Sequence, residues 1–143
     1  MASFRNERYF LSNMYPCKVV INLNNRLYEF TCSESVFQAL KCPERIDEFL
    51  RIDGYAAKRL GRQVKASARW HDPEYRINIM RYALDCKFRQ NPPLAEKLMQ
   101  EKGEIVEINE WHDTFWGVCN NVGENHLGKL LMEIRDKLIR ERT

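Results

Sequence analysis

The stretch from Pro73 to Arg89 is the longest regular pattern in the chain, and it predicts a single amphipathic helix. Apolar side chains recur every three or four positions, which places them on one face of a helix with 3.6 residues per turn. Asp72 can cap the first turn, and Pro73 fits the first helical position, where no backbone N–H is needed. The apolar stripe consists of Ile77, Met80, Leu84 and Phe88.

Five further segments carry helix signals that are shorter or weaker than this one. Pro43 should end the first of them and begin the second, and Gly54 should lie just past the end of the second. Gly61 weakens the third, and Gly103 is expected just past the fourth. The segments are residues 32–42, 43–54, 55–65, 91–103 and the C-terminal stretch.

The C-terminal helix has a stripe that should face the core. Its Gly128 costs about 1 kcal/mol of helix propensity relative to alanine. Close approach of another backbone, or of a ligand, would explain that glycine. The stripe consists of Leu127, Leu131, Ile134 and Leu138.

Residues 17–31 predict a β-hairpin. Two β-rich runs flank Asn24 and Asn25, and asparagine tolerates the positive φ that tight hairpin turns require. Residues 104–109 alternate in polarity and predict one more strand. We therefore expect an α+β fold, mainly helical with a small antiparallel sheet, in one domain that spans residues 1–143.

The composition indicates a globular protein, with 44% hydrophobic and 30% charged residues. No apolar run approaches the roughly 20 residues of a membrane span, and residues 1–20 lack a signal-peptide pattern, so no membrane association is expected. The five cysteines are widely spaced without a CxxC pair, which favours reduced thiols in the cytoplasm. The three histidines lack zinc-site spacing, so no metal is expected. A net charge of +3 is compatible with a phosphorylated small molecule and does not by itself indicate nucleic acid.

The segment SESVFQALK, residues 33–41, places three polar side chains on one side of a predicted helix. Glu34, Gln38 and Lys41 are spaced i, i+4 and i+7, within about 60° of one another at 100° per residue. A second interpretation is structural: Thr31 and Glu34 fit a capping box, and Lys41 would be a solvated residue near a helix end. The pattern alone favours this second interpretation.

Residues 110–129 combine tryptophans, asparagines and glycines in the least helix-like part of the chain. Gly117 and Gly123 would let the backbone approach a ligand closely. A helix that starts near Glu124 or Asn125 would offer free N–H groups to an anion. The alternative is a well-packed loop with core tryptophans.

Two other segments contain candidate ligand-binding residues. Asn13, in residues 11–16, could fix the orientation of a ligand, although a turn asparagine is the simpler interpretation. Arg62 follows a glycine and is suited to bidentate phosphate contact, although a surface arginine is the simpler interpretation here.

Six ordered segments together resemble the NADAR superfamily, the YbiA-like N-glycosidases. The resemblance runs from near the N-terminus to the C-terminal helix. The matching segments are LSNMYPC at 11–17, SESVFQALK at 33–41, AKRLGR at 57–62 with Trp70, KFRQNPPL at 87–94, HDTFWG at 112–117 and GENHLGKLLMEIR at 123–135.

The resemblance implies an enzyme that cleaves an N-glycosidic bond without a metal or organic cofactor. The implied substrates are phosphoribosylated amino-pyrimidine intermediates of riboflavin biosynthesis, or guanine, possibly in DNA, that carries ADP-ribose. The alternative is a non-catalytic module that binds ADP-ribose or a nucleotide. Carried over by motif, the catalytic residues are Glu34, Lys41, Asp113 and Trp70. The expected ligand-binding residues are Asn13, Gln38, Arg62, Trp116, Gly117 and Asn125.

Breaking a ribosyl C1–N bond builds positive charge on the sugar, which a nearby carboxylate stabilises. We expect Glu34 and Asp113 to be brought together by the fold, one as stabiliser and the other as acid or base. A second route is attack by the Lys41 amine on C1 of the opened ribose, which forms a Schiff base. Retention of both Glu34 and Lys41 on one helix favours the enzyme over the binding module.

Overall fold

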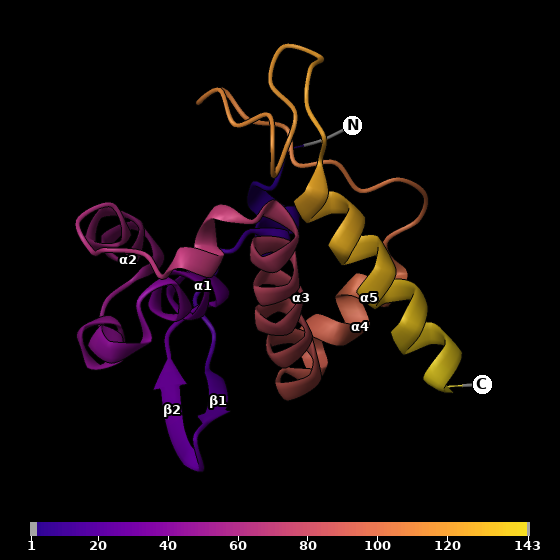
Figure 1. Cartoon of the computed structure of the whole chain (residues 1–143). Coiled ribbons are helices and arrows are strands. Elements are labelled where there is room, and N and C mark those ends of the chain that lie inside the picture. The colour runs from indigo at the N-terminus through magenta and orange to yellow at the C-terminus, as the bar shows by residue number, and fades with distance from the viewer. Residues whose placement is uncertain (1–2, 143) are drawn as a thin grey trace. The chain divides into compact units, whose positions relative to one another are not determined.

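The computed structural model describes residues 3–142, which form helices and one two-stranded antiparallel sheet (Figure 1). This confirms the predicted α+β class. The chain divides into two compact units. One is Asn13–Asn91, and the other joins the residues up to Ser12 with those from Pro92 onward. The single domain expected for residues 1–143 stays a prediction.

The hairpin of the Asn13–Asn91 unit is formed as predicted. Strand β1 (Val19–Leu23) pairs antiparallel with β2 (Arg26–Phe30), and Val19 lies opposite Phe30. The turn residues Asn24 and Asn25 have φ values of 53° and 67°, in the left-handed region that asparagine tolerates.

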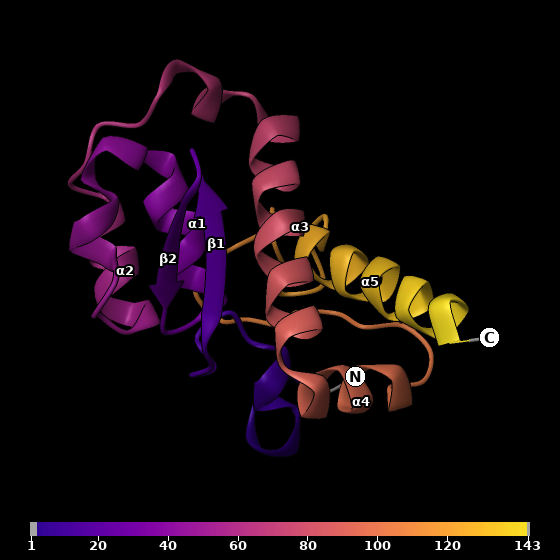
Figure 2. The same ribbon diagram turned by 90° about the horizontal axis from the view of Figure 1, so that it is seen from below.

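Helices surround this hairpin within the same unit. Helix α1 packs against α2, α3 and β2, and α3 also packs against β1, an arrangement that can be followed in Figure 2. Asp72 caps α3 as predicted, because its Oδ1 accepts a hydrogen bond from the Glu74 N–H at 3.0 Å. The elements are α1 (Ser33–Lys41), η2 (Pro43–Phe49), α2 (Gly54–Gly61), η3 (Ala68–His71) and α3 (Pro73–Gln90), where η denotes a 3₁₀ helix.

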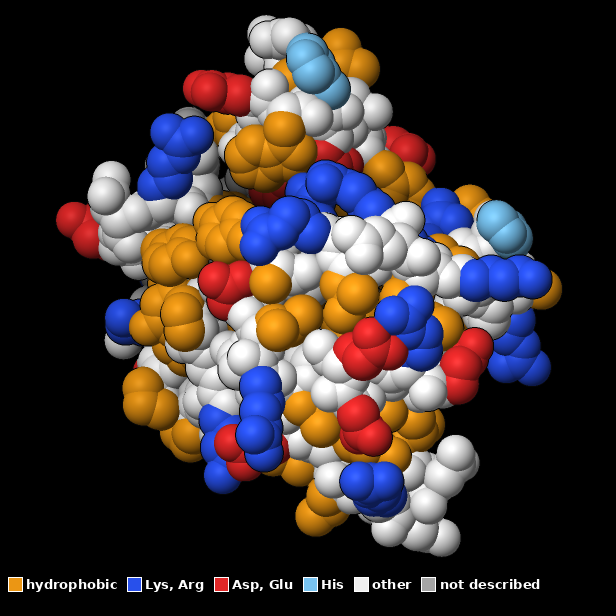
Figure 3. Space-filling view, turned by 90° about the vertical axis from the view of Figure 1, so that its left-hand side faces the viewer, with side chains coloured by type: hydrophobic (Ala, Val, Ile, Leu, Met, Phe, Trp, Pro, Cys, Tyr) orange, Lys and Arg blue, Asp and Glu red, His pale blue; other side chains and the backbone are white. Residues whose placement is uncertain are grey.

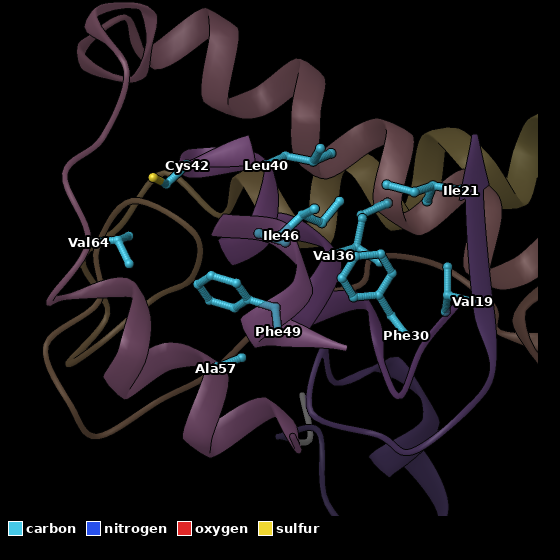
Figure 4. Close-up of a cluster of buried hydrophobic side chains, with 12 residues drawn as sticks. Val19, Ile21, Phe30, Val36, Leu40, Cys42, Ile46, Phe49, Ala57 and Val64 are labelled. Carbon is cyan, nitrogen blue, oxygen red and sulfur yellow. The ribbon is translucent and has the colours of Figure 1, made fainter. Parts of the chain in front are cut away.

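The core of this unit gathers side chains from both strands and from four helices (Figure 4). Val36 of α1 and Phe49 of η2 are fully buried at its centre. Of the predicted stripe of α3, Met80, Leu84 and Phe88 are buried, whereas Ile77 is half-buried. The cluster contains Val19, Ile21, Phe30, Val36, Ala39, Leu40, Cys42, Ile46, Phe49, Ala57, Val64 and Ala83.

The prediction of one helix over residues 43–53, with Gly54 just past its end, is wrong. Only a 3₁₀ helix forms, and Arg45 within it leaves helical geometry at φ −111° and ψ 20°. Gly54 begins the next helix instead of following this one, because Asp53 caps α2 by accepting from the Ala56 N–H at 2.8 Å. An aspartate immediately before a glycine was therefore the decisive local signal.

Helix α2 is shorter than the predicted 55–65. It ends at Gly61, where the N–H groups of Arg62 and Gln63 bond to carbonyls three residues earlier. Such bonds tighten the last turn and stop the α-helix.

The other unit contains η1 (Asn6–Leu11), α4 (Pro92–Gln100) and α5 (His126–Arg142). Helices α4 and α5 pack against each other. Of the predicted core-facing stripe of α5, Leu127, Leu131 and Ile134 are buried, whereas Leu138 is half-buried.

The predicted strand over 104–109 is wrong, since it reduces to an isolated bridge between Ile108 and Val118. Its backbone is bonded by a loop side chain, because the Glu107 N–H donates to Asn125 Oδ1 at 3.0 Å. Gly103 has a φ of 74° but does not directly follow α4, which ends at Gln100.

No helix within residues 3–142 combines the length and hydropathy that a membrane crossing requires. On the face drawn in Figure 3, Lys and Arg side chains are interspersed with acidic and hydrophobic ones. All five cysteines are free thiols.

Candidate functional site

Helix α1 holds a carboxylate–amide pair on one side. Glu34 is only 8% exposed, and Gln38 Nε2 donates to Glu34 Oε2 at 2.7 Å. The spacing of four residues brings the two side chains together, as their positions in the sequence predict. The carboxylate of Glu34 is therefore buried and held by a neighbouring amide, not turned into solvent.

The capping-box interpretation of Glu34 is wrong. Helix α1 has Cys32 as its N-cap, and the hydroxyl of Thr31 instead donates to the Ile52 carbonyl at 2.6 Å. The Glu34 N–H donates to the Asn13 carbonyl at 3.1 Å. A capping pair of Thr31 and Glu34 therefore does not explain a carboxylate at position 34.

Lys41 is bound to a different helix from its own. Its Nζ donates at 2.6 Å to the carbonyl of Gly61, which is the last residue of α2. Burial lowers the pKa of Lys41 below the ordinary lysine value of 10.5. Lys41 is half-buried in the last turn of α1, so the alternative of a solvated lysine near a helix end holds only in part, and the neutral amine is reached more easily than in water.

Trp70 packs its indole on α1. It lies in η3 with 8% exposure, and its ring centroid is 4.9 Å from that of Phe37 at an interplanar angle of 52°. Tyr75 meets it edge-on at 6.2 Å, and Arg76 Nη1 donates to the Trp70 carbonyl at 2.6 Å. The apolar pattern of α1 offered a signal for Phe37, but nothing in the sequence indicated Tyr75.

Asn13 fixes the start of α1. Its Oδ1 accepts from Ser33 Oγ at 3.0 Å, and its Nδ2 donates to Met80 Sδ at 3.4 Å. Its side chain is buried and has this structural role. A role of Asn13 in ligand binding stays a prediction. Arg62, just past α2, is exposed and can reach a solvent-borne phosphate.

Lys87 of α3 is a second buried amine in this unit, fully enclosed at 0% exposure. Its Nζ lies 5.8 Å from the ring centroid of Tyr15 and 5.1 Å from that of Phe88. Burial lowers the pKa of Lys87 to about 8, while interaction with Cys17 and Cys32 acts in the opposite direction.

In the other unit, Asp113 organises a turn. Its Oδ1 accepts from the N–H groups of Phe115 at 3.0 Å and Trp116 at 2.8 Å. Asn109 bonds to the Asp113 backbone in both directions, donating at 2.9 Å and accepting at 3.1 Å. Asn109 was not predicted from the sequence, because it stands in the segment wrongly predicted as a strand.

Asn125 and Gly117 serve the same loop. Asn125 Nδ2 donates to the Ile105 carbonyl at 2.9 Å, and its Oδ1 accepts from Glu107. A Cβ on Gly117 would overlap the Glu107 carbonyl and Asn109. The close approach expected at Gly117 is therefore to this chain's own backbone, and its ligand-binding role stays a prediction.

The expected anion site at the start of α5 lacks its first donors. The N–H of His126 donates to the Phe115 carbonyl at 3.1 Å, and that of Leu127 to the Trp116 carbonyl at 2.9 Å. Trp116 is half-buried and meets the ring of Phe115 edge-on at 4.8 Å. Gly128 accommodates the Ile105 carbonyl, so the expected backbone approach is confirmed there.

The site residues predicted from the sequence thus divide between the two units. The Asn13–Asn91 unit contains Glu34, Gln38 and Lys41 on α1, together with Trp70, which packs against α1. Asp113 belongs to the other unit. The predicted meeting of Glu34 with Asp113 stays a prediction. Within residues 3–142, no group of three or more His, Cys, Asp or Glu side chains is placed to hold a metal ion.

Comparison with known proteins gives the family. The model of the NADAR domain matches residues 2–139, so the chain belongs to the NADAR family. A riboflavin biosynthesis protein of Vibrio vulnificus is 35% identical over an alignment of 138 positions that covers 90% of this chain and 35% of that protein. The chain therefore spans about a third of the length of that relative.

Two shorter relatives match over most of their length. N-glycosidase YbiA of Shigella boydii is 35% identical over 115 residues, covering 77% of this chain and 71% of that protein. The NMR structure of YbiA from E. coli aligns with a TM-score of 0.81 and 28% identity, over 99% of this chain and 84% of that one.

Proposed function

We propose that this chain is an N-glycosidase that hydrolyses the C1–N bond of a ribosyl-phosphate compound. The NADAR match and the relatives named N-glycosidase support the reaction class. The observation that carries the proposal is the buried Glu34 carboxylate, held by Gln38 on the same helix as Lys41. A module that only binds a nucleotide has no need of a buried carboxylate and an amine of lowered pKa on one helix.

Glu34 supplies the negative charge that the reaction needs. As the C1–N bond breaks, positive charge develops on C1 and on the ring oxygen of the sugar. A buried carboxylate fixed by a hydrogen bond stabilises that charge more strongly than one in water, because the surrounding dielectric is low.

Lys41 supports a second route through a covalent intermediate. Its nitrogen bonds to C1 while the base departs with the electron pair of the C1–N bond and takes up a proton. The sugar ring then opens, because the C1–O4 bond breaks and O4 takes a proton from Nζ, which leaves an imine between Nζ and C1. Water then hydrolyses the imine and restores the amine. The pKa of Lys41, lowered by burial, favours the neutral amine that this attack requires.

We assign supporting roles to the remaining predicted residues. Trp70 provides an aromatic wall beside α1, and Arg62 provides an exposed guanidinium for a phosphate. Asp113 is our candidate for the second carboxylate, and Trp116 for a second stacking surface. No step of this scheme requires a metal or organic cofactor.

We infer two candidate substrates: an amino-pyrimidine ribose phosphate of riboflavin biosynthesis, and guanine modified by ADP-ribose. Relatives that are named riboflavin biosynthesis proteins support the first. We further propose a cytoplasmic location, which the five free cysteines support.

A paired assay tests the reaction. The protein is incubated separately with amino-pyrimidine ribose phosphates and with guanine-ADP-ribosylated DNA, and released ribose 5-phosphate or ADP-ribose is measured by mass spectrometry. We expect turnover of one of them. Tight binding of ADP-ribose by calorimetry, without turnover of either, would instead establish a binding module.

Borohydride trapping tests the covalent route. Reduction during turnover should add the mass of the sugar to the peptide that contains Lys41, because borohydride converts an imine to a stable amine. Turnover without any such adduct would establish direct attack by water.

A further inference from the structure

Gly61 contacts two polar side chains of α1, those of Lys41 and Gln38. Its carbonyl accepts the hydrogen bond from Lys41 Nζ at 2.6 Å. The space where its Cβ would stand is filled by the side-chain amide of Gln38, since a Cβ there would overlap Gln38 Oε1 and lie 2.7 Å from Cδ. The same Gln38 amide donates to Glu34.

We propose that Gly61 is a positioning residue for the N-glycosidase reaction, holding Lys41 through its carbonyl and Glu34 through Gln38. This inference rests on the proposed function. The absence of a side chain at position 61 lets Gln38 lie flat against α2 and direct its Nε2 at the carboxylate.

The backbone at position 61 does not itself require glycine. Gly61 lies within α2 and is not among the residues with positive φ, unlike Gly103 and Gly123. Alanine has the higher helix propensity, so glycine at this position weakens the helix. The space taken by Gln38 is therefore the feature that accounts for a glycine here.

Gly61→Ala separates positioning from folding. Gln38 is flexible, so its amide can move away from an added methyl group while α2 gains helix propensity. We expect a melting temperature equal to or above that of the wild type, and kcat about tenfold lower or more with KM nearly unchanged. That kinetic split marks an interaction that acts in the transition state.

Gly54→Ala is the matched control on the same helix. Its added Cβ would overlap Met14 Sδ and crowd Cys32 Sγ and the Met14 backbone, but it would not meet Gln38, so it tests steric crowding at α2 without direct contact with Gln38, Glu34 or Lys41. We expect kcat to stay within about twofold of the wild type.

Gln38→Ala, alone and combined with Gly61→Ala, tests the path. All three variants lack the hydrogen bond to Glu34, so their kcat values should be similar and low. Wild-type kcat in Gly61→Ala or in Gln38→Ala would overturn the proposal. Recovery of wild-type kcat in the double variant would also overturn it, because relief of crowding would then be the whole effect.

An NMR measurement tests the positioning without turnover. The Gln38 side-chain amide protons, identified by their loss in Gln38→Ala, should resonate downfield in the wild type and move toward the free-amide position in Gly61→Ala. Unmoved signals would overturn the positioning role. If the wild type is inactive but its Gln38 amide signals move in Gly61→Ala, the proposed reaction is overturned and the Gly61–Gln38–Glu34 geometry is established.

Discussion

Helix α1 and the loop of residues 105–125 are both rich in polar residues, but they use them differently. On α1, the amide of Gln38 bonds to the carboxylate of Glu34, so one functional group holds another. In the loop, Asp113 and Asn125 bond to backbone N–H and C=O groups. Where a loop outside a sheet lacks a backbone partner for its N–H and C=O groups, side chains can bond to them instead. The high density of polar residues in this loop therefore reflects structure first.

The glycines that lie in or against these two regions differ in the same way. Gly61 of α2 faces the flexible end of a side chain, whereas Gly117 and Gly128 face backbone carbonyls. A side chain can move away from an added methyl group, but a packed backbone cannot do so without distorting its hydrogen bonds.

Glu34→Gln tests the proposed functional role of α1 and should have the largest effect on turnover. Replacing the carboxylate by a neutral amide removes the charge that stabilises the sugar cation, and we expect turnover to fall about 100- to 1,000-fold. The measurement is product release, with circular dichroism to verify the fold. Glu74→Gln, at an exposed position of α3, is the matched control. Equal activity of the two variants would remove Glu34 from the mechanism.

Gly128→Ala tests the structural half. The added Cβ would overlap the Ile105 carbonyl, and we expect the free energy of unfolding to fall by about 1–3 kcal/mol in urea titrations. Gly61→Ala should leave it unchanged or raise it by up to about 1 kcal/mol, since alanine favours the helix. Equal losses in both variants would break the distinction between the two kinds of glycine.

Asp113 has a structural role in the turn of the loop and a proposed role in catalysis. Two substitutions separate these roles. Asp113→Ala removes the acceptor for two N–H groups and should cost about 1–2 kcal/mol of stability. Asp113→Asn keeps a side-chain oxygen in place, so it should nearly retain stability while lowering turnover about tenfold through loss of charge. Full turnover by a stable Asp113→Asn would make this residue structural alone.

The smallest effect concerns the buried amine of Lys87. Below pH 8 both the folded and the unfolded chain hold this proton; above pH 8 the folded chain releases it while the unfolded lysine, with a pKa near 10.5, retains it. The unfolded chain then binds more protons, so Lys87 contributes a rise in stability of about 1 kcal/mol between pH 8 and 9. The raised pKa values of Cys17, Cys42 and Cys86 oppose this rise as the pH approaches and passes 9, because the unfolded thiols release protons that the folded ones retain.

Urea titrations at pH 8 and 9 measure the Lys87 effect. Lys87→Met should lack the rise, whereas Lys18→Met, at an exposed lysine of the same unit, should retain it. A rise that persists in Lys87→Met would assign it to another group.

Local signals accounted for the elements that were predicted well. Asn24 and Asn25 determined the hairpin turn, and Asp72 with Pro73 determined the start of α3, because turns and caps depend on adjacent residues. The failures depended on distant residues. Residues 104–109 alternate as a strand would, yet Asn125 takes the bond that a neighbouring strand would have supplied.

The candidate site shows the same limit. The spacing of Glu34 and Gln38 predicted that they share one side of a helix, because helix geometry alone determines it. The bond from Lys41 to Gly61 was not predictable, since it requires α1 and α2 to pack against each other. The turn that Asp113 organises likewise depends on Asn109 lying beside it in space.

The hydrogen bond from Lys41 to the end of α2 has a consequence for the direction of attack. A protonated Nζ has no lone pair, so the amine must lose a proton before it can react. The neutral amine keeps two N–H groups, so it can still donate one of them to the Gly61 carbonyl while its lone pair points elsewhere. The carbonyl at the end of α2 would then aim the lone pair, and a sugar would have to approach from the side of Nζ that faces away from α2.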